Sequence, residues 1–355
     1  PAAAPPPAER RAPTLQREVQ AGAQAVEPTQ LLSNGRYHVA LRANGAGHSR
    51  RGTVGITRSR DDALRDECGS FLYLRRAAGE PLVSLTQHPA PDAAAHYQAV
   101  FHTDRVCLAA TWPELQTRIT VWVSPEDDIE FRQVELRNLG THTLDLELVS
   151  AFDVTLADAR ADEAHPAFSN LFVRAEWRPA AQALVFERTP RLATERGLHA
   201  AHFITECEPD VVALRGQTER ALWLGRNHVA AQPQATLRAL PAMRSALPFE
   251  TALDTGLDPV CVLAARLLVP PGGRARLTFA TAACDDGATL RAVIDKYRQP
   301  GQVQRASLMS ATLAGIRLRT LRIGSDDLAA IQTLTTALLL GLTRVPTTPV
   351  DAACD

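Results

Sequence analysis

Charged side chains gather early in the chain, in a run that suits the binding of hydroxyl groups. Arg60, Asp62, Arg65 and Asp66 all fall within the segment 60–66. Planar guanidinium groups and carboxylates both form strong, directed hydrogen bonds, so these side chains are candidates for lining a sugar cleft. The same mixture of signs also suits an exposed ion-pair network, in which each pair adds little stability. Both interpretations stay open at this point.

A second candidate combines three kinds of side chain in the segment 165–170. It reads His-Pro-Ala-Phe-Ser-Asn, so His165 supplies an imidazole, Phe168 an aromatic ring and Asn170 an amide. We predict a loop that leads into a strand, and we regard it as the strongest candidate for contact with a ligand. The alternative is a structural corner, in which Pro166 fixes the turn and Phe168 belongs to the core.

The sequence gives no pattern that pairs two carboxylates for acid–base catalysis. Chemistry at a glycosidic bond needs two of them, about 5 to 10 Å apart, and we therefore assign no catalytic residue. Glu126, Asp127 and Asp128 follow Pro125 between two predicted strands, which favours a turn over a metal site. We expect neither a metal nor a cofactor.

The bulk composition excludes several classes of protein. A formal net charge of -1 gives no electrostatic basis for binding nucleic acid. The six cysteines are widely spaced and form no CxxC pair, so we expect reduced thiols and neither a zinc site nor disulfides. The apolar run at residues 337–342 is far too short to span a bilayer, and we expect no direct insertion into a membrane.

The elements that must position these side chains read mainly as strands. Apolar residues alternate with polar ones across residues 117–123, which predicts a strand with one buried face. In the next strand the apolar parity changes between Phe131 and Val134, which predicts a bulge. A turn signal at residues 138–141 leads to a third alternating run at residues 144–148. We therefore predict an antiparallel meander of three strands.

The predicted fold is mainly β, a large antiparallel super-β-sandwich followed by a short helical segment. We divide the chain into a linker, the sandwich, a helical segment and a tail, at residues 1–30, 31–285, 286–343 and 344–355. Apolar residues at helical spacing begin at Leu290, and Ser325 is a suitable N-cap for a last helix. The apolar face expected for that last helix consists of Leu328, Ile331, Leu334 and Leu338.

Four segments, in this order, resemble the β-sandwich region of the bacterial cyclic β-1,2-glucan synthases. That family is related to the cellobiose phosphorylases of glycoside hydrolase family 94, and its sandwich is galactose-mutarotase-like. The segments read LLSNGRYHV from residue 31, TRSRDDALRDECGSFLYLR from 57, VSPEDDIEFRQVELRN from 123 and AHPAFSNLFV from 164. The resemblance covers roughly residues 31–334.

The resemblance implies a module of a larger, membrane-anchored synthase. In that architecture the sandwich supports a helical barrel that carries the catalytic carboxylates and performs glucan chain transfer and cyclisation. We expect the present chain to stop before the barrel, to be non-catalytic by itself, and to have a β-glucan chain and the absent barrel as partners. The implied location is cytoplasmic, at the inner-membrane face. Two alternatives are a stand-alone carbohydrate-binding module and a truncated, inactive remnant.

Overall fold

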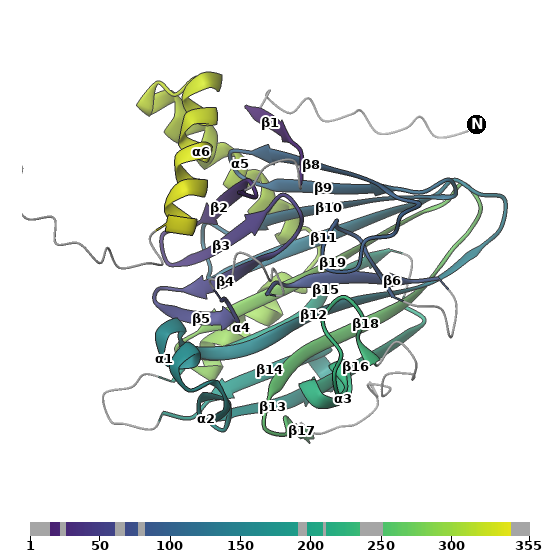
Figure 1. Cartoon of the computed structure of the whole chain (residues 1–355), viewed down its shortest axis with the longest axis vertical. Helices are drawn as coiled ribbons and strands as arrows, with labels where there is room; N and C mark the ends of the chain where they lie inside the picture. The colour runs from purple at the N-terminus through teal and green to yellow at the C-terminus, as the bar shows by residue number, and fades with distance from the viewer. Residues whose placement is uncertain are drawn as a thin grey trace, which may run out of the picture.

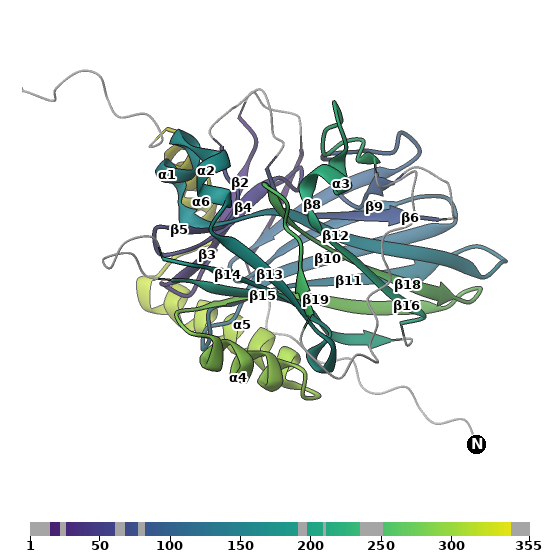
Figure 2. The same cartoon turned by 90° about the horizontal axis from the view of Figure 1, so that it is seen from below.

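Two large antiparallel sheets face each other in the computed structural model, with most of the helices toward one end and α3 (Arg220–Leu224) apart from them beside β16 (Ala213–Glu219) (Figures 1 and 2). This confirms the predicted super-β-sandwich followed by a short helical segment. The structure describes residues 15–21, 26–60, 68–76, 82–190, 197–208, 211–234 and 251–341.

The first sheet has ten strands, and neighbouring strands in it come from distant parts of the sequence. In spatial order they are β1 (Gln16–Val19), β8 (His96–His102), β9 (Val106–Thr111), β10 (Leu115–Val123), β11 (Ile129–Asn138), β19 (Arg274–Cys284), β15 (His199–Glu208), β14 (Ala183–Arg188), β13 (Val173–Arg178) and β17 (Thr251–Leu253). The pairing of β11 with β19 joins the two halves of the chain within one sheet.

The second sheet has nine strands. Its order is β16 (Ala213–Glu219), β18 (Pro259–Val269), β12 (Leu144–Asp158), β5 (Val54–Thr57), β4 (Gly47–Arg51), β3 (Tyr37–Arg42) and β2 (Thr29–Ser33), with β6 (Phe71–Arg75) paired to β12 and β7 (Val83–Ser84) paired to β6. The described helices are α1 (Ala159–Ala164), α2 (Pro166–Asn170), α3 (Arg220–Leu224), α4 (Gly287–Tyr297), α5 (Gln302–Leu321) and α6 (Ser325–Gly341), with a short 3₁₀ turn at Pro179–Ala181.

The main core lies between the two sheets. Ile119 and Val134 of the ten-stranded sheet belong to the same buried cluster as Leu148 and Leu263 of the second sheet. Alternate residues of each strand point to opposite faces, so one face of every central strand joins this core. Burial of this apolar surface is the main contribution to the stability of the sandwich.

A second apolar layer forms where α4 and the start of α5 cover the outer face of the ten-stranded sheet (Figure 2). The predicted helical stripe from Leu290 to Tyr297 is confirmed, because its apolar side chains are buried against this sheet. Tyr297 packs edge-on against Phe131, with ring centroids 5.1 Å apart. At this end the sheet is therefore buried on both faces.

The predicted bulge in β11 is wrong, and the double burial explains the misleading pattern. The pairing of β10 with β11 is continuous, from Trp122 opposite Phe131 to Ile119 opposite Val134. Phe131 points outward into the layer below α4, whereas Val134 points inward to the main core. The apolar parity changes because the covered face changes along the strand, and no residue is inserted.

The predicted three-strand meander is also wrong in its last step. β12 leaves the first sheet and joins the second, where it pairs with β18, β6 and β5. Asn138 holds this crossover, because its side-chain amide donates to the carbonyl oxygens of His142, Val269 and Pro270 at 2.7, 3.0 and 3.0 Å. Residues 138–141, predicted as a hairpin turn, therefore connect a strand of the first sheet to a strand of the second.

Two segments differ from what the sequence predicts for them. The range 1–30 was assigned to a linker, yet β1 within it pairs with β8 and buries Val19. In the last helix, α6, Leu328 is buried, but Leu334 is 59% exposed. The backbone N–H of Thr29 donates to the Thr336 hydroxyl at 2.9 Å and ties α6 to β2.

None of the helices in the described ranges has the length and apolar character needed to cross a membrane.

Candidate functional site

The segment predicted as a ligand-binding loop is helical. α1 and α2 form a corner between β12 and β13, which we call the α2 corner and define as residues 158–172. Asp158 caps α1 by accepting a hydrogen bond from the backbone N–H of Arg160 at 3.0 Å. Pro166 stands at the first position of α2, where its fixed φ favours a helix start and its missing N–H costs nothing. The prediction of a loop missed this second helix.

His165 and Phe168 lie on the surface of the α2 corner. The Phe168 side chain is 46% exposed and packs edge-on against Phe172, with ring centroids 5.4 Å apart. The structural-corner interpretation placed Phe168 in the core, and the structure places it outside. His165 is exposed and joins the two helices through its backbone, whose carbonyl accepts from the N–H of Ser169 at 2.9 Å.

Asn170 is buried beneath the corner, where it belongs to a cluster of charged residues. We call this group the Arg58 cluster and define it as Arg58, Asp153, Asp162, Asn170, Arg220 and Asp258. The Arg58 guanidinium donates to the Asn170 amide oxygen at 3.0 Å, and the Asn170 amide nitrogen donates to Asp258 at 2.8 Å. Both polar atoms of the Asn170 side chain therefore form hydrogen bonds within the protein.

Arg58 connects the α2 corner to strand β12. It forms ion pairs with Asp153 of β12 and Asp162 of α1, each at 3.1 Å. Burial lowers the pKa of Arg58, but the surrounding carboxylates raise it by more, so the guanidinium remains charged. A buried arginine with several carboxylate partners is a structural connection.

The other charged candidates do not join this cluster. Arg60 is exposed two residues beyond Arg58. Asp62, Arg65 and Asp66 lie outside the described residues. The structure therefore places Asn170 against Arg58, which lies just before the first candidate segment, and leaves Arg60, His165 and Phe168 on the surface.

The acidic run at residues 126–128 is a turn, as predicted. Asp127 accepts hydrogen bonds from the Lys296 ammonium at 2.7 Å and the Tyr297 hydroxyl at 2.8 Å, which fastens α4 to the sandwich. Asp128 pairs with Arg36 at 3.0 Å and Arg51 at 2.8 Å. Across the described ranges, no three His, Cys, Asp or Glu side chains come together in a way that would hold a metal ion. Among the cysteines in those ranges, none is joined in a disulfide.

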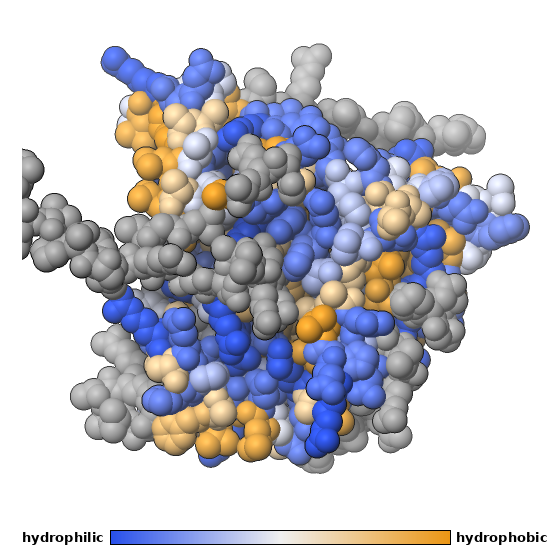
Figure 3. All heavy atoms as spheres, in the orientation of Figure 1, coloured by the Kyte–Doolittle hydropathy of each residue, from blue (hydrophilic) through white to orange (hydrophobic). Residues whose placement is uncertain are grey.

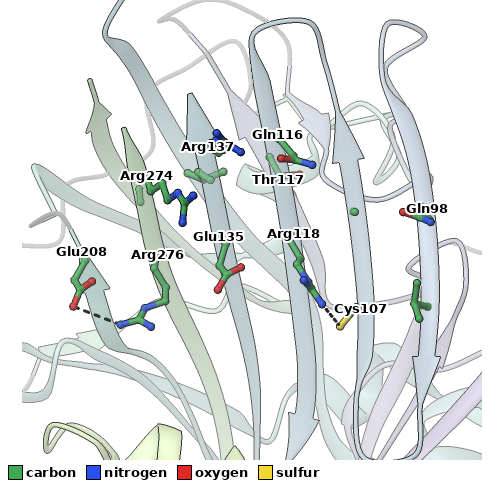
Figure 4. A pocket seen from close by; sticks show the side chains of 14 residues that line it. Gln98, Cys107, Gln116, Thr117, Arg118, Glu135, Arg137, Glu208, Arg274 and Arg276 are labelled. Carbon is green, nitrogen blue, oxygen red and sulfur yellow. Dashed lines mark hydrogen bonds and ion pairs between the residues drawn. The ribbon is translucent and has the colours of Figure 1, made fainter. Parts of the chain in front are cut away.

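A further site lies on the outer face of the ten-stranded sheet, away from any predicted residue (Figure 4). It is a groove of about 640 Å³, and we call it the sheet groove. Its polar lining consists of Gln98, Cys107, Gln116, Thr117, Arg118, Glu135, Arg137, Glu208, Arg274 and Arg276. These residues belong to strands β8, β9, β10, β11, β19 and β15.

Strand pairing arranges these side chains in rows across the sheet groove. In one row Arg118, Glu135, Arg276 and Glu208 are direct neighbours, so positive and negative charges alternate. In the adjacent row, the register places Arg137 directly opposite Arg274. Residues directly opposite in an antiparallel pair have side chains close together on the same face. The second row therefore sets two like charges side by side.

The positive charge of the sheet groove affects a neighbouring thiol. The Arg118 guanidinium donates to the sulfur of Cys107 at 3.4 Å. Burial raises the pKa of the Cys107 thiol, but hydrogen bonds from His102 and Arg118 lower it by more, to about 7. Sequence reasoning missed this groove, although the alternation of polar Gln133, Glu135 and Arg137 with apolar residues marked an open face.

The fold and these sites define a class: a large antiparallel supersandwich with appended helices. Residues 16–300 match the family described as Glycosyl hydrolase 94, supersandwich domain, and the chain belongs to that family. This agrees with the resemblance seen in the four sequence segments.

Two comparisons with individual proteins follow. The chain is 29% identical over 311 residues to the cyclic beta-(1,2)-glucan synthase NdvB of Rhizobium meliloti (strain 1021), a match that covers 86% of this chain and 11% of that protein. This chain therefore corresponds to about a tenth of that curated relative. A bacterial glucoamylase complexed with acarbose superposes with a TM-score of 0.48 at 7% identity, covering 85% of this chain and 38% of the glucoamylase.

Proposed function

We propose that this chain is a non-catalytic module of a cyclic β-1,2-glucan synthase-like glycosyltransferase. In this role the sandwich supports a helical barrel that transfers and cyclises glucan chains. Membership of the supersandwich family and the similarity to a glucan synthase support the proposal. The observation that carries it is the apolar surface of α5 and α6.

The outward faces of α5 and α6 are unusually apolar for a surface. They carry a set of exposed large side chains: Leu308, Leu313, Ile316, Leu321, Ile331, Leu334 and Leu338. Figure 3 shows apolar atoms gathered where α6 projects from the sandwich. A contiguous exposed apolar surface indicates a protein contact. A helical barrel supplies apolar helices that would pack against these two.

The Arg58 cluster supports a structural role for the carboxylates near the α2 corner. Asp153 and Asp258 are each held by two arginines, Arg58 and Arg220. Burial raises the pKa of Asp258, while the arginines act in the opposite direction. A carboxylate engaged in this way is poorly placed to exchange a proton with a substrate.

The surface of the α2 corner is the part of this proposal that concerns glucan. His165 lies exposed at the junction of α1 and α2, and Phe168 lies exposed on α2, whose buried side is held by the hydrogen bond between Asn170 and Arg58. We propose that these side chains reach the glucan cleft of the barrel. Arg60, and the undescribed Asp62, Arg65 and Asp66, remain candidates for the same cleft.

Reconstitution tests the docking part of the proposal. The purified chain is mixed with the purified helical-barrel segment of a cyclic β-1,2-glucan synthase, and complex formation is followed by size-exclusion chromatography with light scattering. We expect a one-to-one complex that Ile331→Glu with Leu334→Glu weakens at least tenfold. Leu257→Glu is the matched control, because Leu257 is 73% exposed and lies outside α5 and α6. An absent complex, or equal weakening by the control, would contradict docking.

Two assays on the chain alone test the remaining parts. Mass spectrometry of linear β-1,2-glucan after incubation should show unchanged chain lengths, and shortened or cyclised products would show that the chain is catalytic. Calorimetric titration with the same glucan, with a β-1,4-glucan as control, distinguishes the proposed barrel-supporting module from a second candidate, a stand-alone carbohydrate-binding module. Selective binding that His165→Ala and Phe168→Ala abolish, without any barrel docking, would favour a stand-alone carbohydrate-binding module.

A further inference from the structure

The sheet groove has an imbalance of charge that the fold does not explain. Its lining contains four arginines and two glutamates. Glu135 and Glu208 alternate with Arg118 and Arg276 along one row, so those charges compensate one another. Arg137 and Arg274 occupy the adjacent row, where the register provides no acidic neighbour between them.

The opposition of Arg137 and Arg274 is unfavourable for the sheet by itself. Like charges directly opposite each other in an antiparallel pair are destabilising. Within the described part of the chain, neither guanidinium takes part in an ion pair with a carboxylate. Figure 4 shows the two side chains on neighbouring strands of the groove. Guanidinium groups on two directly opposite residues can both donate to one oxyanion, such as a phosphate or a carboxylate.

The rest of the groove indicates what carries the oxyanion. A volume of about 640 Å³ is much larger than a phosphate group requires and lies within the range of small-molecule sites. Gln98 and Gln116 add amides that both donate and accept, and Glu135 adds a carboxylate that accepts from hydroxyl groups. A ligand that carries hydroxyl groups beside its oxyanion could therefore bind the amides and Glu135 as well as the two arginines.

The groove is less suited to a neutral glucan. Among the described residues that line it, none is aromatic, so a flat sugar face finds no ring on which to stack. Recognition must then come from charge and hydrogen bonds. We infer that the sheet groove is a binding site for an anionic sugar, whose phosphate or carboxylate lies between Arg137 and Arg274. This inference goes beyond the barrel-supporting role and does not depend on it, because strands of this chain alone form the groove.

Calorimetric titration of the full chain tests the inference, with glucose 6-phosphate, glucuronate, inorganic phosphate and glucose as probes. We expect glucose 6-phosphate or glucuronate, or both, to bind, and the tighter of the two identifies the preferred oxyanion. Inorganic phosphate should bind at least tenfold more weakly, and glucose should give no heat. Raising the salt concentration should weaken binding, because the Arg137 and Arg274 charges are exposed.

The double variant Arg137→Gln, Arg274→Gln should lose at least tenfold in affinity while keeping a cooperative thermal transition. Arg317→Gln is the matched control, since it removes an exposed arginine of α5 that does not line the groove. The inference is overturned if folded wild-type protein binds neither anionic sugar at millimolar concentration. It is also overturned if the double variant binds as tightly as wild type, or if inorganic phosphate binds as well as the sugars.

Discussion

A single strand, β11, presents glutamate and arginine to two very different environments. On its inner face, Glu130 and Arg132 are buried between the sheets and pair with each other at 3.0 Å. On its outer face, Glu135 and Arg137 stand exposed in the sheet groove. The residue types and their spacing of two are identical on the two faces.

Both members of the inner pair have further hydrogen-bond partners, whereas Arg137 of the outer pair does not face an opposite charge. Glu130 also accepts a hydrogen bond from the Ser49 hydroxyl at 2.5 Å, and Arg132 donates to the Ser70 carbonyl at 3.1 Å. Arg137 instead faces Arg274. A charge without partners is very costly in the interior, whereas water solvates it at the surface. The comparison teaches that an unpaired charge is tolerated where water reaches it, and the same exposure leaves it open to a ligand.

The largest expected effect comes from breaking the inner pair. Arg132→Met should lower the free energy of unfolding by about 3–5 kcal/mol, because Glu130 would remain buried without its cation. Urea denaturation followed by circular dichroism measures the loss. The double variant Glu130→Gln, Arg132→Met should recover much of it, since no charge then remains buried. A loss below 1 kcal/mol for the single variant would show that the interior solvates Glu130 in some other way.

The next effect concerns a histidine beside Arg132. His202 is buried between the rings of Phe152 and Phe279 and contacts the Thr281 hydroxyl at 3.0 Å. Burial first, and then the charge of Arg132, lowers the pKa of His202 to about 3. Below pH 6.5 the unfolded chain therefore binds a proton that the folded chain does not bind until about pH 3. Stability is full above pH 6.5 and falls as the pH decreases.

From this linkage, His202 should decrease the free energy of unfolding by about 2 kcal/mol between pH 7 and pH 5. Urea denaturation at the two pH values, in wild type and in His202→Asn, isolates its share from that of other groups. The variant should show a smaller pH dependence by about this amount. Equal pH dependence in both proteins would mean that the imidazole titrates normally in the fold.

The outer face should respond in the opposite direction to the inner one. Arg137→Glu replaces the opposition to Arg274 with an attractive cross-strand pair, and should raise the free energy of unfolding by about 0.2–1 kcal/mol. Thermal unfolding in low salt measures the gain, which should shrink in high salt. A destabilised variant would show that Arg137 has a structural partner, and the contrast between the two faces of β11 would fail.

The smallest effect is expected for the outer glutamate. Glu135→Gln removes an exposed charge between Arg118 and Arg276, and should change the free energy of unfolding by less than about 0.5 kcal/mol. Glu130→Gln is the matched comparison, because it makes the same chemical change on the inner face. If the two substitutions destabilise equally under urea denaturation, burial is not what separates the two faces.

Local patterns in the sequence were sufficient for the fold class and for several elements. Alternation of apolar residues identified the strands around Ile119 and Leu146, and helical spacing identified α4 from Leu290 onward. These signals are local, because apolar residues recur at the spacing of the strand or helix itself wherever one of its faces is buried. The family resemblance rested on continuous segments, and the match over residues 16–300 confirmed it.

The errors occurred where a strand or helix meets more than one neighbour. β11 seemed bulged because α4, more than 150 residues later in the chain, covers its outer face at Phe131. Asn138 looked like an ordinary turn residue, yet it joins two sheets through carbonyl groups of a hairpin near residue 270. Neither partner is visible in a local window of sequence.

The sequence by itself determined the β-rich class, the helical end and the family, since these depend on periodicity and on contiguous segments. Only the tertiary structure decided which charges are enclosed and which are open. Arg58 and Asn170 meet across 112 residues of sequence, and Arg137 and Arg274 meet across a longer separation still. Strand pairing between distant segments places such residues together, and the solvent exposure that results determines whether a charge stabilises the fold or is available to a ligand.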